Sequence, residues 1–179
     1  AEMHMLRMSV VSYFQCSDSV LDHLARGVGR LADESRQRSP RFSINCLGVG
    51  SGRNGDAANR ERNNVFLEFQ QTDANHPLSI LQRDAVTMVG DLPGADLPTE
   101  KGEFHPKINL IEYADLPPAV LADATDFAKG VAIDVGVPSV ARAWRLSLLR
   151  YQSEGAGDEW SHGSWASDVR WENLSSYVL

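Results

Sequence analysis

This 179-residue sequence has few cysteines, little basic charge and no long apolar run. Its two cysteines exclude a disulfide framework and, by themselves, a metal site. Seventeen Lys and Arg against 24 Asp and Glu give a net charge of −7, which disfavours generic nucleic-acid binding. No stretch reaches the ~18 apolar residues that a membrane-spanning helix needs. We therefore expect neither a membrane nor a nucleic-acid partner.

The composition is that of a globular domain, with 42% hydrophobic and 23% charged residues. The length predicts a single domain over residues 1–179. The N-terminus lacks an apolar segment after a basic start, so we expect no signal peptide and a cytoplasmic protein. Cys16 and Cys46 allow one bridge or two reduced, packed thiols, and the tendency of cysteine to be buried favours the second.

Hydrophobic spacing predicts alternating helices and strands. The helices are expected over 17–36 and 115–130, and the strands over 42–47, 65–69, 84–89, 107–113 and 131–137. In the second helix, Val120, Ala124 and Phe127 form one face with Leu116, and Gly130 suits the C-terminal end. This order predicts a leading helical segment (1–40), a core (41–137) and a C-terminal part (138–179).

Three features follow consecutive predicted strands. Gly48, Gly50 and Gly52 form a glycine-rich turn where backbone approaches a ligand closely, although a flexible loop also explains them. Glu68 ends the next strand, where it accepts hydrogen bonds from a ribose or is one polar residue of a half-exposed strand. Asp91 follows Gly90, where it contacts an adenine or simply belongs to a turn.

The order of these features resembles the class I S-adenosylmethionine-dependent methyltransferases, and within them the histamine N-methyltransferase-like branch. The resemblance covers about residues 40–137. It implies an α/β fold with a Rossmann-like, mostly parallel sheet and flanking helices, in a truncated or degenerate form. The chain departs from the family in having Cys46 where an acid is usual, and in the short span between Gly52 and Val65.

The resemblance implies methyl transfer from S-adenosylmethionine to a small-molecule nucleophile such as an amine. The cofactor would contact Gly48, Gly50 and Gly52, with Glu68 on the ribose and Asp91 on the adenine. Tyr113 and His105 would lie near the substrate. Displacement at a sulfonium depends on alignment and desolvation, so we assign no catalytic base. No histidine pair has zinc-ligand spacing, and we assign no metal.

A second hypothesis is a non-enzymatic interaction or structural subunit of mixed or mainly β form. Residues 3–13, 78–89 and 144–151 also read as antiparallel strands. The C-terminal part holds all four tryptophans, including Trp160, Trp165 and Trp171 around His162. These aromatics form a cation cage or anchor a core or interface, and they make oligomerisation through this part an expectation.

Overall fold

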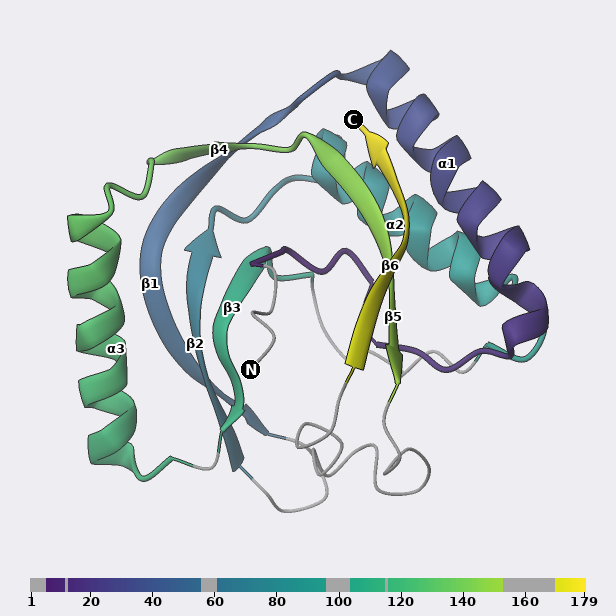
Figure 1. Ribbon diagram of the computed structural model, residues 1–179. Coiled ribbons are helices and arrows are strands. Elements are labelled where there is room, and N and C mark those ends of the chain that lie inside the picture. Colours follow the sequence, from purple (N-terminus) through teal and green to yellow (C-terminus); the bar gives the residue numbers. More distant parts are fainter. Residues whose placement is uncertain (1–5, 12, 56–60, 96–103, 115, 153–169) are drawn as a thin grey trace. The chain divides into compact units, whose positions relative to one another are not determined.

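The computed structural model describes residues 6–11, 13–55, 61–95, 104–114, 116–152 and 170–179 (Figure 1). Its helices are η1 (Asp18–Val20), α1 (Leu21–Arg38), α2 (Pro77–Gly90) and α3 (Pro118–Asp134). Its strands are β1 (Ser43–Gly55), β2 (Glu61–Phe69), β3 (Lys107–Ala114), β4 (Val140–Arg142), β5 (Arg145–Gln152) and β6 (Arg170–Val178).

The chain divides into two compact units, each built from three separate stretches. Unit 1 comprises Ala1–Val11, Ser43–Ser79 and Glu100–Arg142, and unit 2 comprises Ser12–Phe42, Ile80–Thr99 and Ala143–Leu179. Unit 1 therefore holds β1 to β4 with α3. Unit 2 holds α1, the β5–β6 hairpin and most of α2.

Unit 1 is a curled four-stranded sheet in the order β3-β2-β1-β4, and every pair in it is antiparallel. The predicted Rossmann-like, mostly parallel sheet is therefore wrong. Only residues 56–60 separate β1 from β2, whereas a parallel crossover needs a dozen or more residues. The short span between Gly52 and Val65 thus contains the adjoining ends of two antiparallel strands, β1 and β2.

One face of this sheet is apolar and contributes to the core. Val65 and Phe69 on β2 are buried, as is Ile44 on β1. Side chains alternate along a strand, so Phe66 and Glu68 lie on the opposite face. Figure 1 shows α3 along the outer, convex side of the curled sheet, where it contacts β1 and β2.

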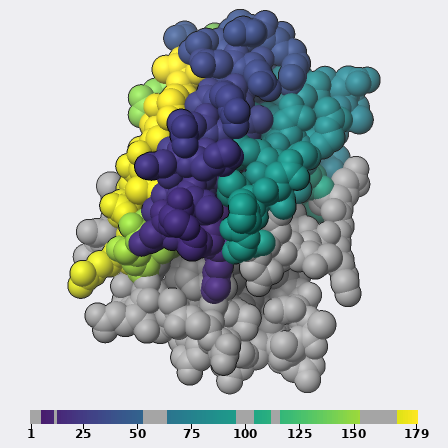
Figure 2. Space-filling view, turned by 90° about the vertical axis from the view of Figure 1, so that its right-hand side faces the viewer, coloured from purple at the N-terminus to yellow at the C-terminus, as the bar shows by residue number. Residues whose placement is uncertain are grey.

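Unit 2 packs α1 against the β5–β6 hairpin and α2 (Figure 2). Leu24, Val28 and Leu31 form the buried face of α1 at helical spacing. Its two glycines permit close approach of neighbours. A Cβ at Gly27 would lie 2.5 Å from the sulfur of Met88, and one at Gly29 would lie 3.1 Å from the Tyr177 ring.

Two predicted strands are helical. The segment 84–89 lies inside α2, because its β-branched residues are part of a longer helical pattern. The buried positions of that pattern are Leu78, Leu81, Ala85, Val89 and, just past the helix, Leu92. The segment 131–137 forms the end of α3 and the turn after it.

Gly136, not Gly130, ends α3. It has φ +66°, its N–H donates to Ile133 O, and Val137 N–H donates to Ala132 O. This pair of bonds is a Schellman motif, which satisfies the last carbonyls of the helix. Gly130 remains inside the helix.

Several other predictions are confirmed. Strands form at 65–69 within β2 and at 107–113 within β3, and the predicted helix 17–36 corresponds to η1 and α1. The ambiguous residues 139–151 form β4 and most of β5. Among the described residues, no helix is long and apolar enough to cross a membrane.

Candidate functional site

The predicted glycine turn lies within β1, which continues to Gly55. Gly48 adopts φ +117° where the register between β1 and β2 shifts. Gly50 pairs with Phe66, and a Cβ at Gly50 would lie 3.0 Å from its ring. Gly52 is also next to that ring, with a would-be Cβ at 3.5 Å. Packing of the Phe66 ring thus gives Gly50 a structural reason to be glycine.

Glu68 lies on a polar sheet face, which we define as Phe66 and Glu68 on β2 with Lys107 and Asn109 on β3. Glu68 pairs with Gly48 on one side and Lys107 on the other. The Lys107 ammonium lies 5.2 Å from the Phe66 ring centroid, a cation–π contact. This face carries one acidic residue, Glu68, and one basic residue, Lys107. The neighbouring strand β1 has glycines at positions 50 and 52, so no side chain covers the face there. Such an arrangement suits recognition of a charged group.

Three members of this face are not among the site residues predicted from the sequence: Phe66, Lys107 and Asn109. The sequence signal for this face is the two-residue period of a strand. Phe66 and Glu68 alternate with the apolar Val65, Leu67 and Phe69, and Lys107 and Asn109 alternate with the apolar Ile108. Register between β2 and β3 then brings the two pairs together. That register is a tertiary property of strands about 40 residues apart in sequence.

The other predicted site residues lie elsewhere. Asp91 is exposed just after α2 in unit 2, and its N–H donates to Thr87 O. Because residues 84–89 are helical, no strand delivers Asp91 to a sheet edge. His105 is exposed before β3, and Tyr113 lies near the end of that strand. The structure therefore groups Glu68 with Gly48 and Gly50, but Asp91 belongs to the other unit.

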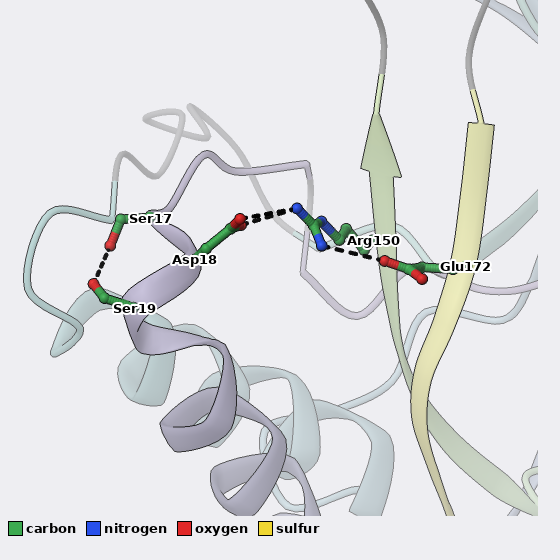
Figure 3. A network of polar contacts seen from close by, with 5 residues as sticks. All are labelled: Ser17, Asp18, Ser19, Arg150 and Glu172. Atoms are coloured by element: carbon green, nitrogen blue, oxygen red, sulfur yellow. Dashed lines mark hydrogen bonds and ion pairs between the residues drawn. The ribbon is translucent and has the colours of Figure 1, made fainter.

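Arg150 on β5 forms the centre of a polar network in unit 2 (Figure 3). Its Nη2 lies 3.0 and 3.1 Å from the two carboxylate oxygens of Asp18, and its Nη1 lies 3.3 Å from Glu172 Oε1. Beside it, burial raises the pKa of the Cys16 thiol, and the Asp18 charge raises it further against the opposing effect of Arg150. A raised pKa leaves less of the thiolate, which is the nucleophilic form of cysteine.

Neither a metal nor a disulfide site is found in the part of the chain that the structure describes. No group of three His, Cys, Asp or Glu residues there could hold an ion. Cys16 and Cys46 are both free thiols. Trp160, His162 and Trp165 of the predicted aromatic cage lie outside the described residues.

The outward side of α3 carries an apolar stripe, defined as Val120, Phe127 and Val131. These positions share one helix face, and their exposed fractions are 46%, 74% and 41%. The sheet-facing side carries Leu121, Thr125 and Ala128 instead, of which Thr125 is buried. Contiguous exposed apolar patches commonly mark interaction sites, so the stripe is a candidate binding surface.

Unit 2 has an exposed surface group of its own, the hairpin patch, defined as the apolar Trp144 and Val178 together with the charged Arg145. Trp144 is 58% exposed and Val178 is 45% exposed. Arg145 pairs with Val178 across the hairpin, and its guanidinium carbon lies 4.2 Å from the Trp144 ring centroid. Tryptophan and arginine are the side chains most often found at the energetic centre of interfaces.

Comparison of this chain with protein-family models, with curated proteins and with solved structures gave no match. Function is therefore inferred from the geometry of the chain itself.

Proposed function

We propose that this protein is a non-enzymatic interaction subunit of mixed α/β form that binds a protein partner through α3. The observation that carries the proposal is the apolar stripe, with Phe127 74% exposed at its centre. Burying one large aromatic side chain contributes about 1.5–3 kcal/mol, so an exposed stripe of three apolar residues is a substantial binding surface. The polar sheet face supplies contacts to charged groups but, by itself, no nucleophile with an adjacent base.

Co-purification with matched variants tests this proposal. Phe127→Ser should abolish recovery of a specific partner, because it removes the centre of the stripe. Ile133→Ser is the control: Ile133 is 79% exposed on the same helix but lies about 140° around it from the stripe. Both variants should melt like the parent. Recovery of the same partners by all three proteins would contradict the proposal.

Methyl transfer from S-adenosylmethionine to a small molecule stays a prediction. The antiparallel sheet removes the parallel framework on which the resemblance depended. Among the five residues assigned to the cofactor, Asp91 lies in a different unit from Gly48, Gly50, Gly52 and Glu68. Calorimetric titration of the parent with S-adenosylmethionine tests this function: saturable heat that Glu68→Ala weakens would support it, and no heat would remove it.

A further inference from the structure

The charges beside the α3 stripe indicate what covers it. With 3.6 residues per turn, Asp123 and Asp134 fall along the solvent edge of the stripe. Within the described residues, neither carboxylate has an ion-pair partner. The one lysine of α3, Lys129, pairs instead with Asp126 at 3.0 Å on the other side of the helix. The stripe is therefore apolar with an uncompensated negative edge.

The hairpin patch has the complementary character. Trp144 and Val178 are its apolar members, and Arg145 supplies its positive charge. Arg36, Arg38 and Arg150 of the same unit are each paired with a carboxylate. No carboxylate among the described residues pairs with Arg145. The chain thus displays two apolar surfaces with unpaired charges of opposite sign.

Self-pairing of two stripes would not use this complementarity. In a twofold antiparallel pair of α3 helices, the edges that carry Asp123 and Asp134 lie on the same side. Four carboxylates would then gather along one edge of the pair, with no positive charge opposite them. The same negative edge opposes docking on an anionic lipid surface.

We propose that the stripe of one copy binds the hairpin patch of a second copy, in a head-to-tail contact between Phe127 and Trp144 with Arg145 facing Asp123 and Asp134. The inference rests on the proposed function and names the partner of that same surface. Such a heterologous contact leaves one stripe and one patch free on every pair. Association therefore continues into a ring or an open filament.

Sedimentation velocity over a range of protein concentrations tests the contact. The mass of the parent should rise with concentration beyond that of a dimer, and added salt should weaken association by screening the charges. Phe127→Ser and Trp144→Ser should each remain monomeric, whereas the control Ile133→Ser should behave like the parent. Each change lies on an exposed side chain, so the variants should melt at the same temperature as the parent. All proteins are compared at equal concentration.

The decisive arm is an equimolar mixture of Phe127→Ser and Trp144→Ser. One intact patch and one intact stripe remain, so the mixture should form a one-to-one dimer and nothing larger. A charge-reversed Asp123→Arg, Asp134→Arg chain should not associate alone, and adding Arg145→Glu to it should restore association.

Three results would overturn the inference. The first is a Trp144→Ser chain that still dimerises, which would mean that two stripes pair. The second is binding of the parent to phosphatidylserine vesicles through Phe127. The third is a parent that stays monomeric at every concentration. In that last case the proposed function is still judged separately, by whether Phe127→Ser loses a different protein in co-purification.

Discussion

Gly48, Gly50 and Gly52 lie two residues apart in β1, yet each meets a different constraint. Gly48 adopts a positive φ, Gly50 lies against the Phe66 ring, and Gly52 has ordinary packing distance to the same ring. From sequence, three spaced glycines suggest one function for all of them. Backbone conformation and cross-strand neighbours, which the sequence does not display, separate them.

Alanine at each position should therefore have a graded effect. Gly48→Ala should lower the free energy of unfolding by about 1–3 kcal/mol, because alanine is strained at φ +117°. Gly50→Ala should cost less, since the Phe66 ring can shift by a few tenths of an ångström. Gly52→Ala should be neutral or slightly stabilising. Urea denaturation of the three variants measures the order, and equal effects would contradict this account.

The two neighbours of Cys16 should move its pKa in opposite directions. In a Cys46→Ser background, Asp18→Asn should lower the thiol pKa, because the Asp18 charge opposes ionisation. Arg150→Gln should raise it, because the guanidinium favours the thiolate. The rate of alkylation by iodoacetamide against pH measures both, with urea-unfolded protein as the reference. Shifts of the same sign would show that the network of Figure 3 does not govern Cys16.

At the scale of elements, local pattern predicted the strands around Val65–Phe69 and Lys107–Tyr113 and the helices α1 and α3. It failed where two patterns overlap. Val86 to Val89 have the β-branched character of a strand, but the helical spacing of Leu81, Ala85 and Val89 prevails once their side chains are buried. The antiparallel pairing of β1 and β2 follows from their short connection. The resemblance to a parallel fold treats the same short span between Gly52 and Val65 as a departure from the family.

The two glycines near the end of α3 provide an element-scale prediction. Gly130 is exposed in the helix interior with open space around it, so Gly130→Ala should stabilise the protein by about 0.5–1 kcal/mol. Gly136 has φ +66° after the helix, so Gly136→Ala should destabilise it by about 1 kcal/mol. Thermal unfolding of the pair measures both signs. A stabilising Gly136→Ala would contradict the assigned helix end.

At the scale of the whole molecule, each unit is assembled from stretches far apart in the chain. α1 lies near the N-terminus, but the hairpin that covers it comes from the last 37 residues, where the Tyr177 hydroxyl donates to Ala25 O. Local patterns do not contain such long-range pairings, so they do not explain the glycines in α1. The sheet of unit 1, by contrast, keeps all its strands within Ser43–Arg142.

This arrangement predicts the effect of removing Ala143–Leu179. Without β5 and β6, α1 loses one of the two described elements packed against it and keeps only α2, so Leu24, Val28 and Leu31 lose part of their cover. Most of the stability of a helix in a protein comes from such packing of its apolar face. Amide hydrogen exchange of the truncated chain should therefore show loss of protection throughout α1. Amides of β2, which is paired on both sides by β1 and β3, should remain more protected than those of α1. Persistent protection of α1 would mean that the hairpin is not what stabilises it.

The point variant Tyr177→Phe, which removes only the bond to Ala25 O, should weaken α1 protection without abolishing it, because a single hydrogen bond contributes about 0.5–1.5 kcal/mol.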